Sequence, residues 1–202
     1  MLKQIESAYP KEVRVVFKQY PLPMHANAKP AAIAAHAAQK QNRFWEMHDL
    51  LLANQRQLDP ASLRRYAESL GLDMAAYDRA VADPESARVI EQQALEAQRA
   101  GVQGTPAFFI NGVQVPIWSF GTMFATMQKL IDAATSGGDV GMAAGQIRAD
   151  LIAQQIAEQQ RKMSNPPPPI DFDKIYEIDT TGSPSKGPAN APITVVEWGD
   201  YQ

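Results

Sequence analysis

The sequence predicts an α/β fold in which a long block of helices interrupts a small sheet. A β-branched and aromatic segment at residues 13–20 is typical of a strand and is closed by two prolines. Residues 27–100 then change to helical periodicity. A second apolar segment, residues 107–110, leads into Asn111-Gly112, a strong short signal for a hairpin that returns antiparallel.

The helical block is predicted to hold about five helices. Residues 31–38 are rich in alanine, whose small side chains allow close packing. Asp59 precedes a proline, which is a typical helix start, and Gly71 is placed to end that helix. Asp73 and Asp83 mark two further starts. Apolar or aromatic residues at helical spacing define the second helix of the block: Phe44, Met47, His48, Leu51 and Leu52.

The chain after the hairpin is predicted to be less regular. Residues 120–134 form an amphipathic helix, and residues 142–163 form a polar helix with a thin apolar stripe. The prolines at 166–169 exclude a helix and favour an extended polyproline segment. Residues 170–191 are rich in proline, glycine and acidic residues, and they are predicted to be a loosely tethered approach to a last strand at 193–197.

Composition excludes several classes of function. The 202 residues are 45% hydrophobic and 20% charged, with a formal net charge of -3, as in ordinary globular proteins. Lysine and arginine are scattered, so the sequence predicts no nucleic-acid partner. Apolar runs stay shorter than the roughly 18 residues of a membrane span, and the first residues lack the pattern of a targeting signal. We therefore expect no membrane insertion.

The sequence contains no cysteine. Disulfide exchange requires a thiolate that attacks sulfur, and no other side chain replaces it. Metal binding is also not indicated, because the three histidines, His25, His36 and His48, lack chelating spacing. The sequence therefore predicts no catalytic residue, no metal and no cofactor.

Both ends of the chain resemble one known family. Residues 192–202 look like the first core strand of a DsbA-like thiol–disulfide oxidoreductase, a branch of the thioredoxin fold, in which Cys-Pro-x-Cys would come next. Residues 1–10 look like the last turns of the helix that follows that motif. The resemblance covers residues 1–135 and about 171–202. It implies a thioredoxin-like fold with an inserted helical domain, cut or permuted so that the motif is absent.

The arrangement that the resemblance implies needs a central strand between the strands at 13–18 and 107–110. Residues 193–197 are the only remaining predicted strand that can fill this position. If the position stayed unfilled, two strand edges would expose their backbone donors and acceptors. The last strand is therefore expected to return to its own chain, which gives a circularly permuted order, or to enter a second copy in a domain-swapped homodimer. The varied composition of the connection favours a slice through a tandem array of such units over an engineered permutant.

The predicted domains follow from this interpretation. Residues 1–135 are the thioredoxin-like core, with the helical insertion at about 27–100. Residues 136–170 are a linker with one amphipathic helix and the polyproline stretch. Residues 171–202 are the approach segment and the first core strand of a thioredoxin-like unit.

The resemblance also implies a substrate-binding loop at Thr105 and Pro106. In the family the matching proline is cis, which leaves the backbone of the preceding residue free to pair with an extended peptide or protein substrate. The alternative is a trans proline that only starts an edge strand.

Glu197 and Lys18 form a second predicted constellation. In the family, the acid and the base at the matching positions lie beneath the active cysteines and help to move protons. The resemblance implies that Glu197 and Lys18 lie side by side as a buried charge pair, which without cysteines has no redox proton to handle and persists as a structural ion pair. Burial would raise the pKa of the carboxyl and the lysine charge would lower it. The alternative is that both residues point into solvent.

His25, a lone histidine in the turn after the first strand, is interpreted as a helix-start or surface residue and is left out of the site.

Three functions remain open at this point. The resemblance implies a thiol–disulfide oxidoreductase of the cell envelope or periplasm, of which this chain is an inactive, cysteine-less portion. One alternative is a redox-inactive module that binds extended peptides as a scaffold or chaperone. The other is a relative that uses serine with glutathione.

Overall fold

The computed structural model describes residues 2–116, 120–160 and 177–201. The polyproline segment predicted at 166–169 lies outside these residues. The helices are α1 (Leu2–Ala8), α2 (Ala28–Gln39), α3 (Phe44–Ala53), α4 (Pro60–Ser69), α5 (Met74–Ala82), α6 (Pro84–Arg99), α7 (Phe120–Thr135) and α8 (Val140–Gln160). The strands are β1 (Val13–Gln19), β2 (Ala107–Ile110), β3 (Val113–Gln114), β4 (Ser185–Lys186) and β5 (Ile193–Gly199).

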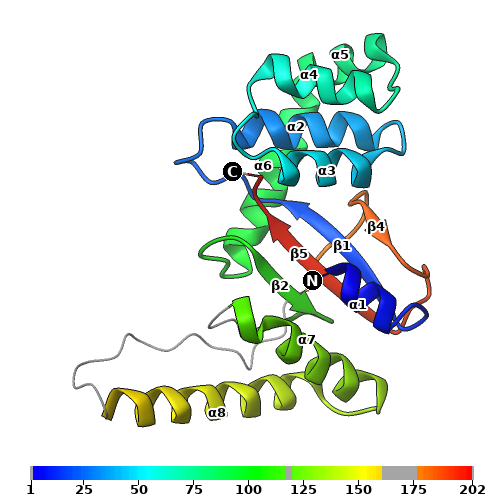
Figure 1. Ribbon diagram of the computed structural model, residues 1–202. Helices are drawn as coiled ribbons and strands as arrows, with labels where there is room; N and C mark the ends of the chain where they lie inside the picture. The colour runs from blue at the N-terminus through cyan, green and yellow to red at the C-terminus, as the bar shows by residue number, and fades with distance from the viewer. Residues whose placement is uncertain (1, 117–119, 161–176, 202) are drawn as a thin grey trace. The chain divides into compact units, whose positions relative to one another are not determined.

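The five strands form one sheet in the order β3-β2-β5-β1-β4 (Figure 1). The last strand of the chain therefore lies between β1 and β2, which confirms the position predicted for residues 193–197. Ile193 N–H donates to Glu12 O at 3.1 Å, and Tyr20 N–H donates to Gly199 O at 2.9 Å, so β1 and β5 run in the same direction. The α/β class with a thioredoxin-like arrangement of the sheet is also confirmed.

Strand β4 was not predicted. It lies in the segment interpreted as a loose approach, and it pairs antiparallel with β1 through Val15–Lys186 and Val16–Ser185. Two polar residues carry no hydrophobic pattern, so nothing in the local sequence indicates this strand. The segment that follows it is held close to β1: Gly187 has a φ of +102°, and a Cβ there would lie 2.3 Å from Val13 O.

We expect Gly187→Ala to lower the free energy of unfolding by about 3 kcal/mol, because it adds both an unfavourable φ and a backbone clash. Gly182→Ala is a matched control, since Gly182 also has a positive φ, +71°, but nothing lies within 4 Å of its Cβ position. The control should lose about 1 kcal/mol. Urea denaturation of both variants measures the difference, and equal losses would show that β4 does not hold Gly187 against β1.

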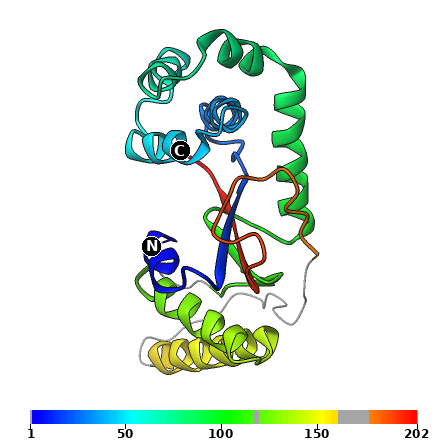
Figure 2. The same cartoon turned by 90° about the vertical axis from the view of Figure 1, so that its right-hand side faces the viewer.

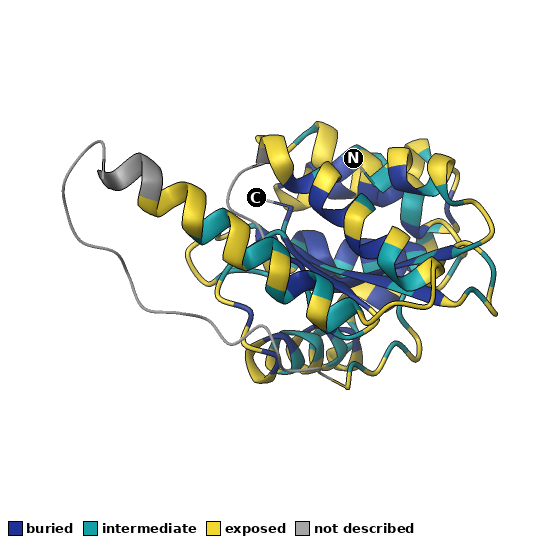
Figure 3. Ribbon diagram, turned by 90° about the horizontal axis from the view of Figure 1, so that it is seen from below, coloured by how far each residue is buried: buried dark blue, intermediate teal, exposed yellow. Residues whose placement is uncertain are grey.

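The structure divides into two compact units, each described by itself. The first comprises Met1–Val16, Phe108–Thr180 and Ser185–Glu197. It holds the main part of the sheet, together with α1, α7 and α8, and α7 packs against α8 (Figure 2). Its strands are largely buried (Figure 3). The fully buried apolar side chains of this unit include Ile5, Val16, Phe109, Ile110, Leu130, Ile131, Ile193 and Val195.

The second unit comprises Phe17–Ala107, Thr181–Pro184 and Trp198–Gln202. Its five helices, α2 to α6, confirm the predicted helical block. Helix α2 lies at the centre of this block and packs against α3, α4, α5 and α6 (Figure 2). Seven buried alanines of α2 let these neighbours approach closely: Ala28, Ala31, Ala32, Ala34, Ala35, Ala37 and Ala38.

The predicted helix starts in this block are confirmed by their hydrogen bonds. Asp59 Oδ1 accepts from the backbone N–H of Ala61 and Ser62, each at 3.1 Å, and so caps α4. Asp73 caps α5 and Asp83 caps α6 in the same way.

Candidate functional site

The loop before β2 carries the predicted binding residues Thr105 and Pro106. Their peptide bond is cis, and both residues are half-buried. The same loop is tied to the end of β1, since Tyr20 Oη donates to Val102 O at 3.4 Å. Ala107, the next residue, is buried and begins β2. The geometry therefore places a partly accessible turn at the start of a buried strand.

Lys18 is buried and pairs with a residue that the sequence did not indicate. Its side chain is only 3% exposed, and Nζ lies 2.7 Å from Oε2 of Glu96 on α6. The Glu96 side chain is 26% exposed. An ammonium that has lost most of its water needs such a partner, because an uncompensated buried charge costs several kcal/mol. The pair therefore joins the end of β1 to the helical block.

We expect Glu96→Gln to lower the free energy of unfolding by about 2 kcal/mol, less than for a fully buried pair because Glu96 is partly exposed. Glu91→Gln is the matched control on the same helix. Glu91 also pairs with a lysine, Lys29, at 2.7 Å, but both side chains of this pair are exposed, so the loss for Glu91→Gln should stay below about 0.5 kcal/mol. Chemical denaturation at pH 7 compares the two variants. A loss for Glu96→Gln as small as that for Glu91→Gln would contradict the structural role of the Lys18 pair.

Glu197 lies on β5 with a carboxyl oxygen shielded from water. Among the described residues its Oε2 has no hydrogen-bond partner. Burial disfavours the charged form, and it raises the pKa of this carboxyl from 4.5 to about 7. The side chain can therefore take up or release a proton near neutral pH. The pairing of Glu197 with Lys18 stays a prediction.

Asp200 and His25 form a contact that the sequence analysis missed. Asp200 follows β5, and its side chain is 1% exposed. Its Oδ2 accepts from Leu22 N–H at 2.9 Å and lies 2.7 Å from His25 Nδ1. When Nδ1 donates this hydrogen bond in the neutral imidazole, Nε2 is left as an acceptor on a partly exposed ring. His25 is thus held by the end of β5, and it is not simply a surface residue.

No local signal could have shown this contact, because the two residues are 175 positions apart in the chain. The turn itself is locally ordered, with His25 N–H donating to Leu22 O at 3.0 Å and Ala28 N–H donating to His25 O at 3.1 Å. Asp200 therefore fixes the turn after β1 relative to the end of β5.

Aromatic side chains pack beneath this part of the second unit. Phe17 stacks on Tyr201, with ring centroids 5.7 Å apart, and His48 meets Phe17 edge-on at 5.0 Å. This packing places the buried His48 in the core of the second unit. Gly199 is constrained by the same cluster, since a Cβ there would lie 2.5 Å from the Phe17 ring.

The described residues include no group of three or more His, Asp or Glu side chains that could hold a metal ion, and the full sequence contains no cysteine. Within the same described ranges, none of the helices combines the length and the apolar character needed to cross a bilayer.

Comparison with known proteins gives one family and several partial relatives. The family model described as DSBA-like thioredoxin domain matches residues 1–132, which include Lys18, Thr105 and Pro106. The chain is 50% identical over 101 residues to the Na(+)/H(+) antiporter NhaA 3 of Salinispora tropica, covering 50% of this chain and 16% of that protein.

Two further relatives carry similar names. The Na(+)/H(+) antiporter NhaA 1 of Salinispora arenicola is 46% identical over 101 residues, which cover 50% of this chain and 16% of the antiporter. The Na(+)/H(+) antiporter NhaA of Herminiimonas arsenicoxydans is 37% identical over 94 residues, which cover 45% of this chain and 15% of the antiporter. The chain thus spans less than a fifth of the length of these relatives. No solved structure matches significantly.

Proposed function

Because the chain belongs to the family of DsbA-like thioredoxin domains, we propose that it serves thiol–disulfide chemistry as a structural and substrate-binding part, without exchanging disulfides itself. The family match over residues 1–132 and the sheet with β5 at its centre support the domain. The observation that carries the inactivity is the absence of cysteine from all 202 residues. We do not propose the Na(+)/H(+) antiport named for the relatives as a function of this chain, because the shared segment is only 15–16% of those proteins.

Insulin reduction with dithiothreitol tests the redox part of this proposal. The chain should not raise the rate above that of dithiothreitol alone, because it cannot form a mixed disulfide. Any thiol-dependent turnover that scales with protein concentration would overturn the proposal.

We propose further that the loop at Thr105 and Pro106 binds an extended polypeptide. The polypeptide would pair with the loop as a neighbouring strand does, through backbone hydrogen bonds. The half-buried position of both residues at the start of β2 supports it. Titration of the 15N-labelled chain with a reduced, unfolded polypeptide should shift the amide signals of Thr105 and Ala107 in a saturable way. Shifts confined to other parts of the chain would favour a different binding surface and contradict this assignment.

The charge pair between Glu197 and Lys18 is retained as a proposal. It would form when the Glu197 carboxyl ionises, that is, above a pH of about 7. A double-mutant cycle with Lys18→Met and Glu197→Gln should show a coupling of about 1 kcal/mol or more at pH 8 and much less at pH 5. Additive effects at both pH values would contradict the pair.

The arrangement of the chain is proposed to be that of a permuted thioredoxin-like unit in the cell envelope. In a permuted monomer β5 fills its own sheet, whereas in a domain-swapped dimer it fills that of a partner. Light scattering coupled to gel filtration distinguishes 22.2 kDa from twice that mass. The domain boundaries predicted at about 135 and 170 stay a prediction.

A further inference from the structure

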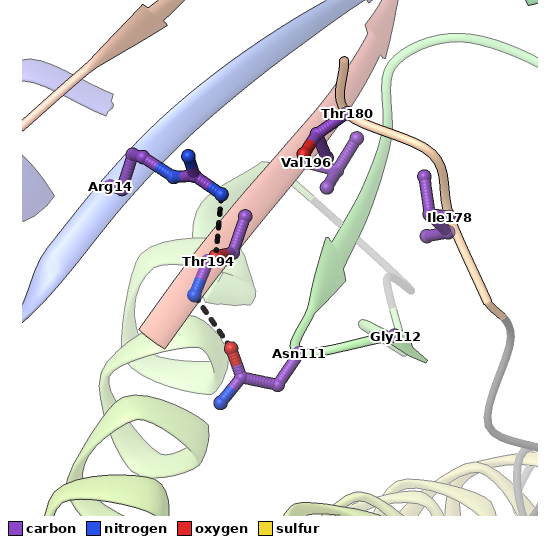
Figure 4. A pocket seen from close by; sticks show the side chains of 7 residues that line it. All are labelled: Arg14, Asn111, Gly112, Ile178, Thr180, Thr194 and Val196. Carbon is purple, nitrogen blue, oxygen red and sulfur yellow. Dashed lines mark hydrogen bonds between the residues drawn. The ribbon is translucent and has the colours of Figure 1, made fainter. Parts of the chain in front are cut away.

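A pocket of about 290 Å³ lies in the first unit, and neither Thr105 nor Pro106 is among the residues that line it (Figure 4). Its floor is formed by side chains of β1 and β5, and its walls come from the turn between β2 and β3 and from the segment that leads to β4. The residues lining it are Arg14, Asn111, Gly112, Ile178, Thr180, Thr194 and Val196.

Arg14 supplies the charge of this pocket. In the part of the chain that the structure describes, its guanidinium makes one hydrogen bond, from Nη2 to Thr194 Oγ1, and at 3.4 Å this bond is long (Figure 4). A guanidinium has five N–H donors in a planar fork that matches an anion with two oxygens. No acidic residue is among the described residues that line the pocket. Most donors of Arg14 are therefore available to a ligand.

Asn111 makes one wall rigid. Its Oδ1 accepts from Thr194 N–H at 2.6 Å, and its Nδ2 donates to Pro192 O at 3.2 Å. The same residue has a positive φ of 49°, and Gly112 after it has a φ of 83°, so the turn holds both residues at the pocket. The hydroxyls of Thr180 and Thr194 add two further groups that can donate a hydrogen bond to an oxyanion.

We propose that this pocket binds a small oxyanion, either a carboxylate or a phosphate, with Arg14 as the principal ligand-binding residue. Arg14 forms no ion pair with a described residue, two hydroxyls lie beside it, and none of the described lining residues is a carboxylate, so the pocket favours negative charge. The volume lies just below the roughly 300–1,000 Å³ of ordinary small-molecule sites, so the ligand must be small. Asp179 lies in the sequence between the lining residues Ile178 and Thr180, but it does not line the pocket itself. A substitution of Asp179 therefore serves as a control for a change of charge near the pocket.

Inorganic phosphate and malonate are the probes, titrated separately into the 15N-labelled chain at constant ionic strength with chloride as the balancing ion. The amide signals of Gly112 and Thr194 should shift in a saturable way with at least one probe. Saturation by phosphate alone identifies a phosphate ligand, and saturation by malonate alone identifies a carboxylate. Shifts that grow linearly with both probes would overturn the proposal.

Arg14→Gln should weaken the binding at least tenfold, whereas Arg56→Gln, which removes an exposed arginine of the second unit, should leave it unchanged. Asp179→Asn should not weaken it. If Arg14→Gln fails to fold, as judged by circular dichroism, Thr180→Val replaces it and should weaken binding at least threefold. Unchanged affinity in the folded Arg14 or Thr180 variant would overturn the site. The result does not depend on the insulin assay, because the pocket needs no thiol chemistry.

Discussion

Val195→Asp is expected to abolish folding. Val195 lies in the middle of β5 and is fully buried, in a strand with neighbours on both sides. The substitution removes apolar burial and places a carboxyl where the wild-type side chain has no contact with water. The expected loss exceeds about 5 kcal/mol, which is comparable to the total stability of a typical domain. Circular dichroism and urea denaturation at pH 7 measure it.

Val195→Thr is the matched control, because threonine keeps the shape and the β-branching of valine. It replaces one methyl by a hydroxyl and should cost about 1–3 kcal/mol while the fold is kept. A folded Val195→Asp variant with an unchanged denaturation midpoint would show that β5 is not in the core of the sheet.

Glu197→Gln is expected to stabilise the protein at alkaline pH and to change little at acidic pH. The folded pKa of Glu197 is about 7, whereas an unfolded glutamate titrates near 4.3. Between these values the folded protein holds a proton that the unfolded chain releases. The contribution of Glu197 to the free energy of unfolding is therefore fully present below a pH of about 4.5 and is lost as the pH rises through 7.

The wild type should consequently lose up to about 3 kcal/mol, relative to Glu197→Gln, between pH 4.5 and pH 8. The measured quantity is the difference in the free energy of unfolding between variant and wild type at several pH values. In this difference the contributions of all other titrating groups cancel. Glu91→Gln, which removes an exposed carboxyl, should give a difference that stays flat over the same range. A flat difference for Glu197→Gln as well would contradict the raised pKa.

The main elements of the fold could be predicted because their signals are local. Aspartate caps, alanine-rich periodicity and the Asn111-Gly112 turn each act within a few residues of the chain. The central position of β5 followed from a resemblance combined with the requirement that strand edges be paired. Strand β4 could not be predicted, since Ser185 and Lys186 form a strand only because β1 offers them partners.

The candidate site was less accessible to sequence reasoning. Thr105 and Pro106 were found because the resemblance to the family implies a substrate-binding loop at these two residues. The partners of the charged residues were not, because Lys18 and Glu96, or His25 and Asp200, lie far apart in the chain and meet only after folding. A buried lysine needs an anionic partner, but the sequence does not show which carboxylate this partner will be.

Hydrogen–deuterium exchange of the backbone amides tests the central position of β5 most directly. The amides of β5 should exchange as slowly as those of β1, since both strands are paired on two sides within the sheet. Exchange of the β5 amides within the first minutes, while those of β1 remain protected, would contradict the account.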